Sequence, residues 1–227
     1  MIAGATSSHA QAISAEVELG AYRTDVREVG SLVARVTVIV IALCMVAGVA
    51  HAAPSEAEAN VAGRQLLIAL RILSYDKQLA ERSPGTTITV ALVSSPTTAG
   101  RALRQRFEAG FALMPKAKVG GRALRLVSFD AGNTKAITAA LTAKAPSVVI
   151  VVDDLGDRLA PLKTAARARR VLTMSLRESD VTNGVSVGIV AGREREQIVI
   201  NVEASRAEGV KFGAGLLQLA RLVEAER

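Results

Sequence analysis

The sequence contains few of the residues on which most enzyme chemistry depends. Its 227 residues include one cysteine, two histidines and no tryptophan, and only 3% are aromatic. His9, Cys44 and His51 all lie in the first 51 positions. If this stretch is removed from the mature protein, the remainder cannot form a Ser-His-Asp triad, a Cys-His pair, a zinc site of the usual ligands or a thiol redox centre. We therefore expect a non-enzymatic protein with no catalytic residue, no cofactor and no metal site.

The chain is too apolar to be disordered. Hydrophobic residues make up 50% of it, and 28 Lys and Arg residues against 21 Asp and Glu residues give a net charge of +7. This composition suits one medium-sized folded domain with an additional targeting segment. The excess of positive charge favours an acidic partner.

An uncharged apolar run near the N-terminus predicts export. Residues 36–49 follow Arg35 and precede the small-x-small sequence Ala50-His51-Ala52. Because this run is shorter than the ~20 residues of a membrane-spanning helix, it is typical of a secretory signal peptide. We predict a signal peptide over residues 1–52, cleaved after Ala52, and a periplasmic α/β domain over residues 53–227. Residues 1–31 contain four acidic residues, which suggests that translation starts further in and that the first Met is too early.

This N-terminal stretch has three other interpretations. The apolar run can be an uncleaved anchor, or the stretch can be a cytoplasmic tail before a true anchor. Lipidation of Cys44 is rejected because Leu43 stands where a small residue is required. A cleaved signal peptide leaves a domain without cysteine, which must be stable in an oxidising compartment through burial alone.

The rest of the chain alternates between β-branched apolar runs and amphipathic segments. The spacing predicts strands over residues 87–93, 123–129, 147–152, 171–176, 185–190 and 196–202, and helices over 58–79, 98–113, 133–143, 155–169, 203–208 and 212–224. This order predicts a single three-layer α/β domain with a mixed, mainly parallel sheet, a C-terminal β-hairpin and a closing helix.

Polar residues at two predicted strand ends form a candidate ligand cleft. They are Ser94, Ser95, Asp153 and Asp154. The aspartate pair suits a magnesium ion, but a helix cap by Asp154 is the favoured interpretation. The turn from Ser94 to Gly100 suits an anion at a helix N-terminus, but it lacks a phosphate-loop motif, so an ordinary capped turn is favoured. The cleft supports an alternative function, a periplasmic solute-binding protein for small anions.

A second group of residues is a candidate partner surface. It contains Arg158, Lys163, Arg167, Arg169 and Arg170, together with Tyr75 and Asp76. The basic residues are equally consistent with a solvated helix face, and the default role of the Tyr75-Asp76 pair is a hydrogen bond at a helix end. Nucleic acid is not expected as a partner, because exported proteins rarely meet it and stacking aromatic residues are nearly absent.

The C-terminal segment carries a recognisable pattern. A strand ending in Ile200-Asn201 leads to Ala204, Ala207 and Gly209, and then to Leu216-Leu217-x-Leu219-Ala220. In this pattern the chain resembles the YfiR family of small exported proteins, and the likeness extends over about residues 60–223. We expect Asn201 to hydrogen-bond the backbone and Leu216, Leu217 and Leu219 to be core residues.

The resemblance implies a function. YfiR-type proteins are periplasmic repressors that bind the periplasmic sensory region of a membrane-bound diguanylate cyclase and lower cyclic-di-GMP synthesis. It implies at most peripheral contact with the membrane and leaves a homodimer open. Better-studied members have disulfides, which the region after Ala52 cannot form, so redox control is not implied here.

Overall fold

The computed structural model describes residues 53–192 and 195–223. The predicted signal peptide and the proposed later translation start lie outside these residues. Within the described part, no helix has both the length and the apolar character needed to cross a membrane.

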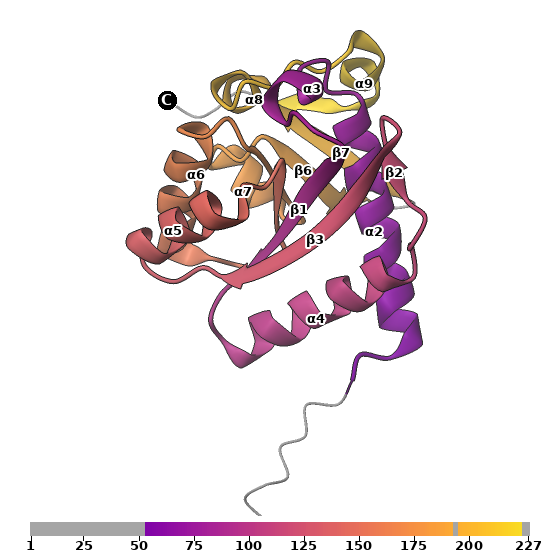
Figure 1. The fold of residues 1–227 in the computed structure, drawn as a ribbon, viewed down its shortest axis with the longest axis vertical. Coiled ribbons are helices and arrows are strands. Elements are labelled where there is room, and N and C mark those ends of the chain that lie inside the picture. The colour runs from indigo at the N-terminus through magenta and orange to yellow at the C-terminus, as the bar shows by residue number, and fades with distance from the viewer. Residues whose placement is uncertain (1–52, 193–194, 224–227) are drawn as a thin grey trace, which may run out of the picture. The chain divides into compact units, whose positions relative to one another are not determined.

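A mixed sheet runs through the middle of the domain (Figure 1). In the described residues its strand order is β2-β3-β1-β4-β5-β6-β7-β8. The strands are β1 (Thr87–Ser94), β2 (Lys118–Val119), β3 (Arg122–Asp130), β4 (Val148–Val151), β5 (Leu172–Ser175), β6 (Val187–Ala191), β7 (Glu196–Asn201) and β8 (Arg221–Val223). The central five, from β3 to β6, are parallel, and β6 and β7 form the expected antiparallel hairpin. The predicted fold class is confirmed.

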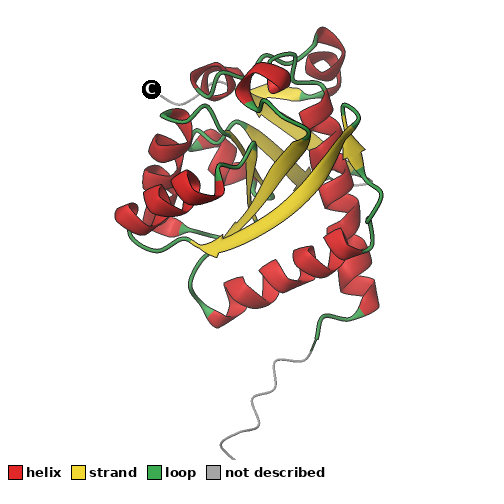
Figure 2. Cartoon of the chain, in the orientation of Figure 1, coloured by secondary structure: helices red, strands yellow, loops and turns green. Residues whose placement is uncertain are grey.

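Helices cover both faces of the sheet (Figure 2). One face carries α2 (Glu56–Ser74) and α4 (Thr98–Ala112), and the other carries α5 (Thr134–Lys144) and α6 (Leu159–Arg167). The shorter helices are α3 (Leu79–Arg82), η1 (Gly156–Arg158), α7 (Glu178–Thr182), α8 (Val202–Ala207) and α9 (Ala214–Leu219). Because side chains alternate along a strand, Val90 and Leu92 of β1 belong to the core below α2, and Ala91 and Val93 belong to the core below α5 and α6.

Two glycines bring α2 and α4 close together. A Cβ added at Gly110 would lie 2.6 Å from the backbone nitrogen of Gly63 and 2.7 Å from the carbonyl oxygen of Ala59. Neither approach leaves room for a side chain, so the helices cross with their backbones almost in contact. The crossing holds the C-terminal end of α4 against α2.

The two end segments differ from the predicted helices. The first helix ends at Ser74 instead of residue 79, because the chain turns at Asp76 and pairs there with Phe212 as an isolated bridge. The last helix ends at Leu219, and β8 follows and pairs with β7. Leu219 is 75% exposed, so its assignment to the core was wrong, whereas Leu216 is buried. Both differences arise from pairing between segments distant in sequence, which local periodicity does not reveal.

Candidate functional site

The carboxyl ends of β1 and β4 form the topological switch point of the sheet. The chain leaves β1 towards β3 through α4 on one face, and leaves β4 towards β5 through α6 on the other. Ligands of open α/β sheets bind in the crevice between such strand ends. Two residues of the predicted cleft, Ser95 and Asp153, meet here.

Asp153 and Ser95 are bonded to each other. One carboxylate oxygen of Asp153 accepts from the Ser95 backbone N–H at 2.8 Å, and the other accepts from the Ser95 hydroxyl at 2.5 Å. Gly100 of α4 packs directly on this pair, because a Cβ at that position would clash with both side chains. The Thr97 hydroxyl accepts from the Gly100 N–H at 3.0 Å and caps the helix. The Thr97 cap agrees with the favoured interpretation of this turn, and the carboxylate of Asp153 lies near the start of α4, where the alternative would have placed an anion.

The other two residues of the predicted cleft lie apart from this pair. Ser94 is fully buried, and its hydroxyl accepts from Arg104 at 3.2 Å. Asp154 is exposed and accepts from the N–H of Gly156, the first residue of η1, at 2.9 Å. This bond, aided by the ion pair with Arg177, holds the pKa of Asp154 below its ordinary value. The bond closes a turn just before η1. The N-cap positions of η1 and α6 are Leu155 and Arg158, and neither helix has a side-chain cap, so the predicted helix cap by Asp154 is not formed.

Asp153 and Asp154 are hydrogen-bonded to different residues and have no partner in common. Among the described residues, no three His, Cys, Asp or Glu side chains gather as a metal site would require. A ligand cleft at these strand ends stays a prediction. The Ser95 and Asp153 atoms that would bind a ligand there are already bonded to each other.

Two further aspartates at this edge were not singled out in the sequence. Asp130 ends β3, and although burial alone would raise its pKa, hydrogen bonds from Arg104 and Arg101 outweigh that effect and lower it. Asp180 is buried behind β5, and burial raises its pKa despite a 2.6 Å hydrogen bond from the Ser175 hydroxyl. Asp130 lies at a strand end and Asp180 lies in α7, and only the tertiary fold brings them to the same edge of the sheet.

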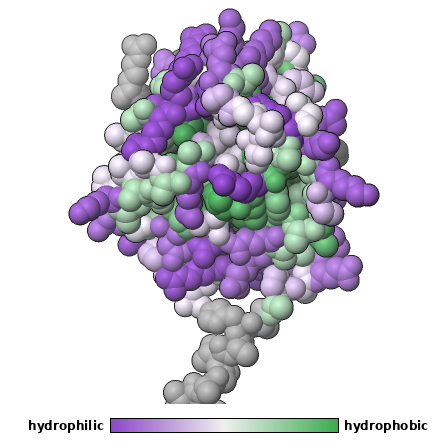
Figure 3. Space-filling model, viewed as in Figure 1, coloured by the Kyte–Doolittle hydropathy of each residue, from purple (hydrophilic) through white to green (hydrophobic). Residues whose placement is uncertain are grey.

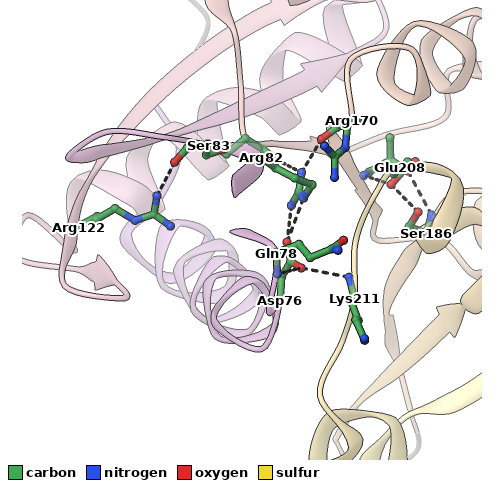
Figure 4. Close-up of polar contacts among 11 residues, drawn as sticks. Asp76, Gln78, Arg82, Ser83, Arg122, Arg170, Ser186, Glu208 and Lys211 are labelled. Carbon is green, nitrogen blue, oxygen red and sulfur yellow. Dashed lines mark hydrogen bonds and ion pairs between the residues drawn. The ribbon is translucent and has the colours of Figure 1, made fainter. Parts of the chain in front are cut away.

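Asp76 is buried, and Figure 4 shows polar contacts of its side chain. Its carboxylate accepts from Arg82 through Nε at 3.1 Å and Nη2 at 2.6 Å, and from the backbone N–H groups of Gln78 and Lys211 at 3.0 and 3.1 Å. Neither side chain of the Asp76–Arg82 pair is exposed. Tyr75 caps α2 and packs half-buried against the core. The bonds of Asp76 therefore connect the end of the first helix to the segment after α8. They agree with the interpretation of Tyr75-Asp76 as a hydrogen-bonded helix end.

The five basic residues of the predicted partner surface do not form one patch. Lys163 donates to the carbonyl of Asn183, and Arg167 donates to the carbonyl of Gly184 at 3.1 Å. The guanidinium of Arg170 lies against Gly209, which follows α8. Arg169 reaches the C-terminal part of α5, and Arg158 is exposed in η1 at the other end of the helix. Partner binding through these residues stays a prediction.

Sequence reasoning missed Glu208, which is fully buried beside β5 and β6. Its carboxylate accepts from the Thr173 N–H at 2.8 Å and from the hydroxyls of Thr173 and Ser186 at 2.5 Å each. Burial raises its pKa to about 7, although the bonds from Ser186 and Thr173 act in the opposite direction. The signal in the sequence is the presence of Thr173 and Ser186 in and beside apolar strands. Hydroxyl groups at such positions indicate a buried polar partner.

The layered sheet and these contacts define a three-layer α/β domain whose polar groups at the sheet edges hold the domain itself together. A profile of the YfiR/HmsC-like family matches residues 67–221, and the chain belongs to this family. The match confirms the resemblance seen in the C-terminal segment. No curated protein matches the chain.

Several solved structures are similar in part. A conserved domain protein from Vibrio cholerae O1 biovar eltor is 16% identical, with a TM-score of 0.49 over 73% of this chain. An ABC domain in complex with L-Trp from Streptococcus pneumonia is 11% identical, with a TM-score of 0.44 over 67% of this chain. The chain covers 60% of the length of each of these two structures.

Proposed function

We propose that the protein is a periplasmic regulator that represses a membrane-bound diguanylate cyclase by binding its periplasmic sensory region. The observation that carries this proposal is the family match over residues 67–221, which extends from α2 to β8. The family is regulatory rather than catalytic. Repression by binding requires a stable scaffold and a partner surface, and no reactive group.

The outer edge of β3 is the surface that we assign to the partner. Beyond Ala123, nothing in the described part of the sheet pairs with this edge. The N–H groups of Ala123 and Ala131 donate to β1, so with a period of two the backbone groups of Leu124, Leu126 and Ser128 point outwards. An unpaired strand edge binds an extended segment of another protein through backbone hydrogen bonds.

The surface around this edge has the character of a protein interface. Figure 3 shows apolar side chains in the centre of this face, about where Figure 1 places β3, with hydrophilic side chains around them. An apolar centre within a polar rim is typical of surfaces that bind other proteins.

Deletion and complementation test the function. Deletion of the gene should raise cellular cyclic-di-GMP, and the wild-type chain should restore the lower level and capture the cyclase from solubilised membranes. An unchanged nucleotide level after deletion, with no cyclase captured, would reject the regulatory role itself.

Ser128→Pro tests the surface separately. It removes one outward N–H while leaving the hydrogen bonds from β3 to β1, so the fold should persist and repression should be lost. Arg158→Glu, with Arg71→Glu on α2 as the matched exposed control, tests the predicted basic surface. A folded Ser128→Pro protein that still captures the cyclase would place the interface elsewhere.

A further inference from the structure

A cavity of about 700 Å³ lies at the amino ends of the parallel strands, on the side of the sheet covered by α5 and α6. It opens between the C-terminal ends of these helices and the first residues of β1 and β5. Three arginines line it, Arg82, Arg125 and Arg169, together with hydroxyl groups that include Thr87 and Thr142. This volume is typical of pockets that bind small molecules.

Arg125 is held in place at the mouth of the cavity. It stands opposite Thr89 in the register of β3 and β1, and its Nε and Nη2 donate to the Thr89 hydroxyl at 3.3 and 3.0 Å. The donors of Nη1 are not used in these bonds. The guanidinium is therefore ordered before any ligand arrives, which lowers the entropic cost of binding.

Arg169 is ordered in the same way from the opposite wall. Its Nη2 donates to the Thr142 hydroxyl at 2.8 Å, and its Nη1 donates to the carbonyl of Ala165 at 3.2 Å. Arg82 completes the lining, with Nη1 donating to the carbonyl of Arg170 at 2.6 Å.

Positive charge in the cavity is only partly balanced. Among residues 53–192 and 195–223, no lining residue is acidic, and the only carboxylate bonded to a lining arginine is Asp76, which neutralises Arg82. Within the described residues, neither Arg125 nor Arg169 forms an ion pair with a carboxylate. The C-terminal ends of α5 and α6 contribute partial negative charge, which Lys144 and Arg167 in their last turns offset.

We propose that this cavity binds a small molecule that carries a phosphate or carboxylate group. Two ordered guanidinium groups with neighbouring hydroxyls are the donor set that recognises such an anion. Leu141, Val171 and Pro146 line the same cavity and provide an apolar surface for the body of the molecule. The site lies at the edge of the sheet opposite to the predicted cleft.

Titration calorimetry with the purified protein at constant ionic strength tests this site. The probes are inorganic pyrophosphate and citrate, which separate phosphate from carboxylate recognition. Saturable binding of at least one probe is expected. Arg125→Gln and Arg169→Gln should each weaken it by about tenfold or more, since each removes charge-assisted hydrogen bonds. Arg71→Gln, which removes an equal charge on the other face of the sheet, should leave binding unchanged.

Thermal unfolding of each variant without probe verifies that the fold is retained. Absence of saturable binding by both probes, or an equal loss of affinity in Arg71→Gln, would overturn the proposal. Because binding is measured on the isolated protein, its failure leaves the cyclase proposal untouched, and a failure to capture the cyclase leaves this site untouched.

Discussion

The two edges of the parallel sheet differ in what they offer a ligand. The carboxyl edge carries aspartates, and each of them is bonded to a neighbouring group of the protein, as Asp153 is to Ser95. The amino edge carries arginines around a cavity, and two of them have no carboxylate partner in the described residues. Location at a switch point is therefore not sufficient for a ligand site, because the same crevice can be filled by the side chains of the fold.

The carboxylates inside the domain also differ in how they are stabilised, and this difference does not follow the two edges. Asp76 at the amino edge is paired with Arg82. Glu208, near the starts of β5 and β6, is bonded to hydroxyls and one N–H, and at the carboxyl edge Asp153 is bonded in the same way. Substitutions at these positions and at their neighbours should have effects of different size, and the following predictions rank them.

Asp76→Ala should have the largest effect. It leaves Arg82 as a buried charge without its partner and removes the acceptor for the N–H groups of Gln78 and Lys211. Loss of one member of a buried ion pair costs about 3–5 kcal/mol of unfolding free energy, measurable by urea denaturation. Asp76→Asn keeps an acceptor and should cost less. A loss below about 1 kcal/mol for the alanine variant would show that Arg82 is stabilised in another way.

Glu208→Gln should change how stability depends on pH. The folded-state pKa of about 7 lies above the ordinary value of 4.5, so below about pH 4.5 the acid is protonated in both states. As the pH rises through this window, the unfolded chain ionises first, and the wild type loses up to about 3 kcal/mol of stability. The variant does not ionise there.

The readout is the difference in unfolding free energy between Glu208→Gln and the wild type at a series of pH values. It should shift in favour of the variant between pH 4.5 and pH 8. A constant difference across this range would mean that Glu208 keeps its ordinary pKa in the folded protein.

Gly100→Ala should disrupt the carboxyl edge directly. The new Cβ would lie 2.8 Å from the Ser95 carbonyl oxygen and would also clash with the Asp153 carboxylate, at a cost of about 1–3 kcal/mol. Gly215→Ala in α9 is the matched control, because nothing lies within 4 Å of its added Cβ. Thermal unfolding should therefore show a clear loss at position 100 and none at 215. Equal melting temperatures would indicate that the Ser95–Asp153 pair can move aside.

Asp154→Ala should have the smallest effect. The side chain is 61% exposed in its ion pair with Arg177, so solvent screens the interaction. A loss below about 1 kcal/mol in the same denaturation assay is expected. A loss as large as that of Gly100→Ala would show that the start of η1 depends on this carboxylate.

Most of the elements were predictable from the sequence because their signals are local. The β-branched run before Ser94 and the hydroxyl residues after it are enough to predict β1, a capped turn and α4. The hairpin of β6 and β7 follows from two short apolar strands joined by a tight connection. By contrast, β8 and the break after Ser74 depend on contacts with β7 and with Phe212, which no local window contains.

The candidate sites were less predictable for the same reason. Ser95 and Asp153 are 58 positions apart, and their direct bond is a property of strand order. The basic residues between 158 and 170 look like one patch in the sequence. In the structure Lys163 and Arg167 reach Asn183 and Gly184, whereas the long side chains that follow α6 reach other neighbours.

The sequence by itself determined the order of the six longer strands, most of the helices and the family, since hydrophobic periodicity and a short motif are both local features of the chain. Only the tertiary structure decided that Asp153 fills the switch point and that Arg82, Arg125 and Arg169 share one cavity. These residues come from segments far apart in the sequence. Burial and charge pairing depend on which segments meet, and that is fixed only when the sheet assembles.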